Sequence, residues 1–426
     1  MTSEVLLMNR GAVAMAADSA VTIMGQHGHT IYQSVNKVFQ LVEGQPVGVM
    51  IYNNAEIMGT PWETVIALYR KQAVDRAFDA VEDYARDFVK FIDGNTELFP
   101  PDAQELEFIR MVAFLYGAVV REYDAEIRYS NEGGAVTGGA SEIFAHVVRE
   151  VHGIYQMHFD GQARADLECY PPDFAERLKK KYKAVIDEII DSLEHYMSQQ
   201  IPGFKLDEQT RTLLRDLAGF VASKDAYFEG YTGIVFAGFG RKEQFPAMVS
   251  YFTSGVLENV LKRSIDRKRR INADSGPAIM PFAQDRMVHT LIRGIDPDLR
   301  YQIFNETLRL TNFLVQDVVR SIPGLNETTR QSFIKKYSED NLASALAAFF
   351  ERIDMYQRHA YTEPILRAVD NLPRMELAET AASLVKLNSF QLRVSGQPET
   401  VGGPIDVAII SLADGLVMIE DSHTYA

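Results

Sequence analysis

Short apolar runs, each bounded by turn-forming residues, predict β-strands at both ends of the chain and in one central block. Residues 3–9 and 12–18 form the first pair of runs, which Arg10 and Gly11 separate. We expect three further hairpins from the same pattern. They cover residues 37–53, with a turn at residues 43–45; residues 231–252, with a turn at residues 241–243; and residues 405–420, with a turn at residues 413–415.

Apolar positions at helical spacing predict that most of the remaining chain is α-helical. A helix is expected from residue 60 to 72, with Thr60 as its cap and Glu63 three residues further on. Residues 174–197 carry the clearest pattern, with Asp173 as a plausible N-cap. Polar, glycine-containing loops are expected at residues 19–36 and 131–141. Other helical stretches are residues 63–127, interrupted at residues 99–101, several helices within 285–370, and residues 372–387.

The order of these elements is not the regular alternation of a doubly wound sheet. Hairpins, helices, a central strand pair, more helices and a final hairpin fit an α+β fold of antiparallel sheets sandwiched by helices. The chain has 426 residues, of which 46% are hydrophobic, so a large core can form.

Composition narrows the classes of function. The net charge of −15 argues against broad nucleic-acid binding, which needs a basic surface. Cys169 is the single cysteine, so no intrachain disulfide forms, which fits a reducing compartment. No apolar run has the roughly 18 residues of a membrane span, and no basic segment precedes the first apolar run. We therefore expect a cytoplasmic protein that binds neither nucleic acid nor membrane.

Thr2 is the first candidate for chemistry. If the first hairpin turns around Arg10, paired residue numbers add up to about 20, and Thr2 lies across from Asp18. Cross-strand neighbours have Cβ atoms roughly 4.5–5.5 Å apart. Removal of Met1, which small second residues usually permit, would give Thr2 both a hydroxyl and a free α-amine. Those two groups are the minimum for an N-terminal nucleophile.

Lys37 is the second candidate, because a cation activates a hydroxyl nucleophile. It begins the strand that follows the loop after Asp18. Asp18 would hold the lysine toward Thr2, where its charge lowers the pKa of the hydroxyl and of the α-amine. The alternative is that Lys37 is a surface strand residue with an incidental partner.

These residues and several strings resemble those of proteasome β-subunits and of the bacterial proteasome-like peptidase that works with an ATP-driven unfoldase. The resemblance rests on Thr2, on Ala16-Ala17-Asp18-Ser19 and on Asn36-Lys37-Val38, and it continues in VGVMIYNNAEIMG, AGFGRKEQFP and VGGPIDVAIISLADG. It implies that Thr2, Asp18 and Lys37 are catalytic. It also implies a single domain over residues 1–426, with a four-layer αββα sandwich of antiparallel sheets. The core would comprise about residues 2–70, 229–285 and 372–420, with helical insertions at about 75–228 and 286–370.

The chain departs from the family pattern in three places. Tyr52 and Asn53 replace a glycine pair whose backbone N–H serves the oxyanion hole, and the amide of Asn54 is a further candidate there. Ser275, or the turn at residues 280–284, would replace a supporting serine. Glu399 or Thr400 would stand for the supporting residues near the last hairpin, or that support is absent.

Other signals are weaker. Gly238 and Gly240 lack a P-loop lysine and are better explained by a strand turn. His27 and His29 have no evident partner ligands, so neither a metal nor another cofactor is expected. The basic cluster at residues 267–270 is typical of a solvated face, with docking of an acidic partner as the alternative.

The sequence thus favours a threonine peptidase that cleaves peptide bonds after Met1 removal. The resemblance implies a homo-oligomer, with a ring among the arrangements, and raises an ATPase partner. Two alternatives stay open. One is a small-molecule amidase with the same chemistry, and the other is a catalytically silent proteasome-like scaffold or binding protein.

Overall fold

A computed structural model describes residues 2–420 except 26–27, 33–34, 132–138, 157–165, 229, 274, 337–341 and 395–402. The chain divides into two compact units. The first comprises residues 1–38, 243–246 and 270–426, and the second comprises residues 39–242 and 247–269. Each contains helices and a five-stranded sheet, and every strand pair with a defined register is antiparallel. The predicted α+β class is confirmed at this level.

The sheet of the first unit holds the beginning of the chain in its interior. The strand order is β12-β1-β2-β13-β14, so β1 is hydrogen-bonded on both sides. Central strands in this position are fully buried, which explains their nearly continuous apolar sequence. The five strands are β1 (Ser3–Met8), β2 (Val13–Asp18), β12 (Ala278–Ala283), β13 (Ile405–Ser411) and β14 (Gly415–Glu420).

The register of the first hairpin differs by one residue from the prediction. Glu4 pairs with Ala17 and Met8 with Val13, so paired numbers add up to 21. The cause lies in the turn, where Arg10 and Gly11 form a two-residue loop. The side-chain oxygen of Asn9 accepts hydrogen bonds from the Gly11 and Ala12 backbone N–H groups. Ser3, and not Thr2, therefore lies at the level of Asp18.

A long helix, α13 (Arg374–Val394), covers the sheet of the first unit. It packs on β1, β2 and β13 through a core that includes Val5, Ala14, Leu377 and Val385. This confirms the predicted amphipathic helix and extends it by two turns. The other elements of this unit are β3 (Val21–Gly25), β4 (Gly28–Tyr32), α8 (Arg286–Arg293), α9 (Pro297–Ser321), α10 (Glu327–Lys336), α11 (Ala343–Gln357), the π-helical turn η3 (Arg358–Thr362) and α12 (Glu363–Asp370).

The second unit contains the sheet β11-β10-β9-β6-β5, and α2 packs on β9 and β10. Gly238, the last residue of β9, and Gly240 have a packing role. A Cβ at Gly238 would lie 2.0 Å from the Pro46 carbonyl oxygen, and a Cβ at Gly240 would lie 2.4 Å from the Asp79 carbonyl oxygen. The elements are β5 (Val38–Gln40), β6 (Val47–Asn53), β7 (Glu56–Ile57), β8 (Thr60–Pro61), α1 (Trp62–Gln72), α2 (Val81–Ile92), β9 (Thr232–Gly238), β10 (Ala247–Leu257) and β11 (Val260–Arg270).

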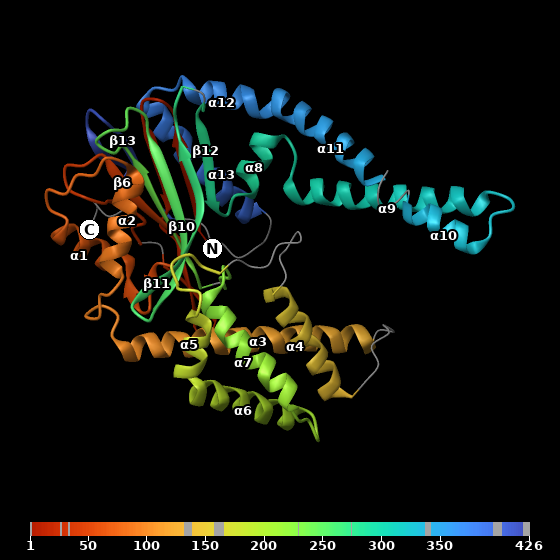
Figure 1. Ribbon diagram of the computed structural model, residues 1–426. Helices are drawn as coiled ribbons and strands as arrows, with labels where there is room; N and C mark the ends of the chain where they lie inside the picture. Colours follow the sequence, from red (N-terminus) through yellow and green to blue (C-terminus); the bar gives the residue numbers. More distant parts are fainter. Residues whose placement is uncertain are drawn as a thin grey trace. The chain divides into compact units, whose positions relative to one another are not determined.

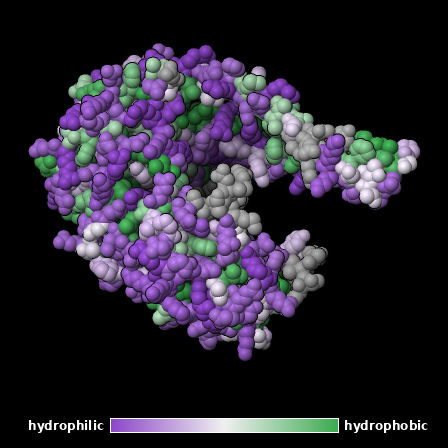
Figure 2. Space-filling model, viewed as in Figure 1, coloured by the Kyte–Doolittle hydropathy of each residue, from purple (hydrophilic) through white to green (hydrophobic). Residues whose placement is uncertain are grey.

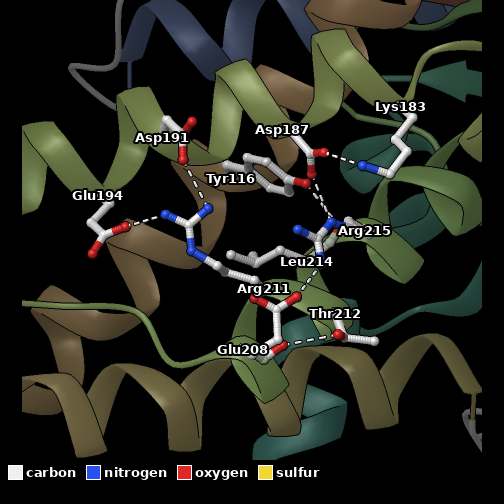
Figure 3. A network of polar contacts seen from close by, with 10 residues as sticks. All are labelled: Tyr116, Lys183, Asp187, Asp191, Glu194, Glu208, Arg211, Thr212, Leu214 and Arg215. Atoms are coloured by element: carbon white, nitrogen blue, oxygen red, sulfur yellow. Dashed lines mark hydrogen bonds and ion pairs between the residues drawn. The ribbon is translucent and has the colours of Figure 1, made fainter.

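The remaining helices of the second unit lie together as a group (Figure 1). They pack around a second hydrophobic core, to which Leu257 of β10 also contributes. Ion pairs link α6 and α7 on the outside of that core (Figure 3): Arg215 bonds Asp187, and Arg211 bonds Asp191 and Glu194. These ion pairs remain partly exposed to solvent, and pairs near the surface each contribute roughly 0–1 kcal/mol. The helices are α3 (Pro101–Asn131), α4 (Ala140–Gln156), α5 (Phe174–Lys181), α6 (Lys183–Gln200) and α7 (Glu208–Ser223).

Three local predictions are wrong. The predicted loop at residues 19–36 contains the strand pair β3 and β4. Thr60 does not cap α1, which begins after Pro61 with no side-chain cap. The predicted helix over residues 174–197 breaks at Tyr182, and the Asp173 side chain makes no capping bond. The break rotates the buried stripe of α6 to Ile186 and Ile190.

Candidate active site

Thr2 lies at the beginning of β1, where the backbone is fixed from the β12 side. The backbone N–H of Gln284, just after β12, donates to the Thr2 carbonyl at 3.0 Å. The Thr2 side chain is buried, with 1% of the residue exposed, and its hydroxyl donates to Glu4 Oε2 at 3.2 Å. The hydroxyl of the candidate nucleophile is therefore held by Glu4, which lies two residues further along the chain, in β1.

Asp18 and Lys37 meet beside this strand end. The Lys37 ammonium donates to Asp18 Oδ1 at 2.8 Å, and the same oxygen accepts the Ser3 backbone N–H at 3.0 Å. Asp18 is fully buried and Lys37 is 3% exposed. The predicted pairing of the aspartate with the lysine is thus present, and the surface alternative for Lys37 does not hold.

The Lys37 ammonium uses its three donors on three different acceptors. Besides Asp18, it donates to the Ala20 carbonyl oxygen at 3.0 Å and to Glu4 Oε1 at 3.2 Å. Three acceptors match the hydrogen-bonding capacity of an ammonium group. An ammonium group buried without such partners would carry a large desolvation cost, which these three contacts offset.

Glu4 is the site residue that sequence reasoning missed. One of its carboxyl oxygens accepts from the Thr2 hydroxyl and the other accepts from the Lys37 ammonium. It thereby links the nucleophile to the cation. Two signals pointed to it: a carboxylate inside an otherwise apolar strand run, and a position two residues from Thr2, where strand side chains share a face.

Burial sets the charge state of Glu4. Desolvation raises the pKa of Glu4 from 4.5 to about 8, with the nearby Asp18 carboxylate acting in the same direction and Lys37 opposing both. At pH 7 the Glu4 carboxyl is therefore mostly neutral. The buried cluster then holds one negative group, Asp18, and one positive group, Lys37, which is the balance that a dry interior favours.

Asn388 supports this strand end from α13. Its side-chain amide donates to Ser3 Oγ at 2.8 Å and to the Gln284 carbonyl at 2.7 Å. The Gln284 backbone N–H in turn donates to the Thr2 carbonyl, so the Asn388 amide links Ser3 and Gln284, the two residues that flank Thr2. Asn388 lies one residue beyond the predicted helix end, and it is a buried polar residue on an otherwise apolar helix face.

The residues expected around the oxyanion hole belong to the second unit. Asn53 ends β6 with a φ of 70°, and its side-chain amide donates to the Tyr231 carbonyl at 2.8 Å. The Asn54 amide donates to the Gly230 carbonyl at 3.3 Å, and the Tyr52 hydroxyl donates to Asp266 at 3.4 Å. These side chains tie β6 to the segment before β9 and to β11. A role toward Thr2 stays a prediction for all three.

The expected supporting residues have different outcomes. Ser275 lies before β12, whose first residue pairs with Met8, whereas Thr2 lies at the opposite end of the same ladder. Five residues of strand separate those ends, about 16 Å. The Ser275 hydroxyl donates to the Arg270 carbonyl and closes its own turn. The alternative turn at residues 280–284 is the one that contacts Thr2, through Gln284. Glu399 and Thr400 lie outside the described residues.

Other chemistry finds little support. Among the residues that the structure describes, no group of three or more His, Cys, Asp or Glu side chains is arranged to hold a metal ion. His27 lies outside that part of the chain. Burial raises the pKa of the Cys169 thiol, which disfavours the reactive thiolate. Within the same described part, no helix has the length and apolar character needed to cross a membrane.

Comparisons with known proteins find distant similarity among solved structures. No family model matches the chain, and no curated protein matches it. Among solved structures, the chain is similar to Anbu (ancestral beta-subunit) from Yersinia bercovieri, with 8% sequence identity, 99% of this chain and 89% of that chain covered, and a TM-score of 0.29. A TM-score of 0.29 is below the level that defines a shared fold, so the function proposed next rests on the site geometry.

Proposed function

We propose that the protein is a threonine-type N-terminal nucleophile hydrolase that cleaves peptide bonds after Met1 has been removed. The observation that supports this proposal is the buried chain of contacts from the Thr2 hydroxyl through Glu4 to Lys37 and Asp18. A purely structural strand end has no need for two carboxyl groups and an ammonium group in its interior, since an apolar core of similar volume is often at least as stable.

The reaction follows from the chemistry of these groups. Thr2 Oγ1 attacks the substrate carbonyl carbon, the C–N bond breaks, and the amine product leaves with the proton given up by the hydroxyl. Water then hydrolyses the ester on Thr2 and releases the acid. The Lys37 charge lies one carboxyl group away from the hydroxyl and stabilises the developing alkoxide in a low-dielectric site.

The fold proposal is an αββα sandwich of the N-terminal nucleophile hydrolase type. Its support is that each unit supplies a five-stranded sheet with helices packed on it, α13 in the first and α2 in the second. Because α2 packs on β9 and β10, it belongs to the sandwich in this proposal. The other helices between residues 75 and 228, and those between 286 and 370, remain insertions.

Self-assembly is proposed on the basis of α9. This helix exposes large apolar side chains around much of its circumference, and of its residues only Val319 is buried. A large exposed apolar surface of this kind is normally covered by a partner. Hydrophobic residues are visible at the right-hand end of Figure 2, where the α9–α10 region lies in Figure 1. Its exposed apolar residues are Leu299, Tyr301, Ile303, Phe304, Leu310, Phe313, Leu314 and Val318. A homo-oligomer is the proposed cover, and an ATPase partner stays a prediction.

The decisive experiment combines intact-mass analysis with covalent labelling. Intact mass shows whether the purified chain begins at Thr2. A β-lactone probe is then expected to acylate Thr2 and to add its mass to the N-terminal peptide, whereas Thr2→Ala shows no adduct and Thr2→Ser keeps it. A chain that begins at Thr2 and takes up no probe would be a silent scaffold. Cleavage of small amides without cleavage of peptides would instead favour the amidase.

A further inference from the structure

Glu4 occupies a position where a carboxyl group has no structural justification. It lies inside β1, flanked by Ala17 on β2 and Phe282 on β12, and it is fully buried. A carboxyl buried there costs free energy that an apolar side chain would not. One of its carboxyl oxygens accepts a hydrogen bond from the Thr2 hydroxyl, and the other accepts one from the Lys37 ammonium.

We infer that Glu4 is a catalytic residue that accepts the proton of the Thr2 hydroxyl and returns it to the leaving amine. This inference rests on the proposed function and adds a residue to it. Glu4 Oε2 lies 3.2 Å from Thr2 Oγ1, at the limit of the range expected of a general base. The α-amine that Met1 removal would create is the competing acceptor, and the experiment below separates the two.

The proton transfers balance in both halves of the reaction. In the first half, Thr2 Oγ1 forms a bond to the carbonyl carbon while its proton moves to Glu4. The same proton then moves to the nitrogen as the C–N bond breaks. In the second half, water gives a proton to Glu4 as it attacks the ester. Glu4 returns that proton to Thr2 Oγ1 as the acid product leaves, so no other reactant is consumed.

The groups around Glu4 define its pH dependence. Asp18 on β2 and Lys37 ahead of β5 are the charged groups that act on it, and Thr2 is its neutral partner. β12 carries no titratable residue between Ala278 and Ala283. Asp406 on β13 pairs with Ala17, on the far side of β2. Removal of Met1 adds the α-amine of Thr2 as one further titratable group.

A base has to be ionised, so activity is expected to rise with pH. With a pKa of about 8 for Glu4, about one tenth of the molecules carry the carboxylate at pH 7 and about nine tenths at pH 9. The rate of acylation is therefore expected to increase about tenfold between these pH values, provided that Thr2 is the nucleophile.

The test measures the acylation rate of Thr2 by a β-lactone, from pH 6 to pH 10, in Met1-free protein. Glu4→Gln keeps the side-chain volume and removes the base, so the rate is expected to fall by about 10²–10⁴ and to lose its alkaline limb. Glu4→Asp retracts the carboxylate by one methylene group and is expected to recover part of the rate with the limb retained. Glu107→Gln is the matched control, because Glu107 is a partly buried glutamate of the second unit whose pKa burial also raises. It is expected to leave the rate and the limb unchanged.

Infrared difference spectroscopy gives a readout that does not depend on activity. The wild type is expected to show a protonated-carboxyl band that disappears between pH 7 and pH 9 and that Glu4→Gln lacks. If Glu4→Gln fails to fold, Glu4→Asp and this band decide the matter. Acylation of Glu4→Gln within threefold of the wild type, with the same pH profile, would overturn the role of Glu4 and leave the hydrolase standing. A wild type that no probe acylates would overturn the hydrolase and the role of Glu4 with it.

Discussion

Replacement of Glu4 by glutamine is expected to change how the stability of the first unit depends on pH. Burial raises the pKa of Glu4 to about 8, from an ordinary value of 4.5 in the unfolded chain. Between these pH values the folded state holds a proton that the unfolded state releases. The contribution to the free energy of unfolding is therefore fully present below about pH 4.5 and is lost as the pH rises through about 8.

The size of the effect follows from the same two values. The pKa of Glu4 is higher by about 3.5 in the folded state than in the unfolded chain. A pKa difference of one corresponds to about 1.4 kcal/mol, so the contribution to the free energy of unfolding is roughly 5 kcal/mol at most. The slope is about −1.4 kcal/mol per pH unit in the middle of this range. Glutamine does not titrate, so Glu4→Gln is expected to remove this part of the slope. Glu107→Gln, in the second unit, leaves it in place for β1 and β2.

Urea denaturation at about pH 5.5, 6.5 and 7.5, which lie between the ordinary and the raised pKa of Glu4, measures the slope for the whole chain. Hydrogen exchange of peptides from β1 and β2, corrected for the intrinsic exchange rate, assigns the slope to the first unit. An unchanged slope in Glu4→Gln, or stability of β1 and β2 that increases with pH in the wild type, would refute the reasoning that desolvation keeps this carboxyl protonated.

Three further outcomes are expected. Lys37→Met leaves two buried carboxyl groups without a cation and is expected to lower the free energy of unfolding by about 3–5 kcal/mol at pH 8. The loss is expected to be smaller in a Glu4→Gln background, and equal losses in both backgrounds would contradict an energetic contribution from the Lys37–Glu4 contact. Thr2→Ala removes one donor from Glu4 and is expected to cost about 1 kcal/mol while abolishing β-lactone labelling; retained labelling would place the nucleophile elsewhere. Gly238→Ala forces its Cβ against the Pro46 carbonyl and is expected to destabilise the second unit by about 1–3 kcal/mol in urea denaturation, and an unchanged midpoint would show that the backbone yields at little cost.

Sequence periodicity was sufficient to predict the strands and helices that bury one face against the core. The hairpins at residues 37–53 and 405–420 turn where glycine takes a positive φ, at Gly44 and Gly415. The helix over residues 374–394 shows its apolar face in the sequence, because the positions that contact the sheet recur every three or four residues. The pairing of Asp18 with Lys37 was also predicted, because Lys37 begins the strand that follows the loop after Asp18, and the structure contains this ion pair.

The predictions that failed did so for different reasons. In the first hairpin, the Asn9 side chain accepts from Gly11 in the turn and donates to the distant Val369 and Leu372 carbonyls. The break at Tyr182 occurs within a sequence whose apolar period continues. Ser275 and the turn at residues 280–284 were equivalent candidates until the register of β12 on β1 placed Gln284, and not Ser275, beside Thr2.

The sequence by itself determined the antiparallel hairpins, the helical segments and the presence of Thr2, Asp18 and Lys37, because short-range spacing encodes which side of an element meets the core. Only the tertiary structure assigned a role to Glu4 and to Asn388. Burial from strands β12 and β2 raises the pKa of the glutamate, and helix α13 carries the asparagine to the end of β1. Desolvation and contacts across hundreds of residues arise from packing, and no local pattern in the chain records them.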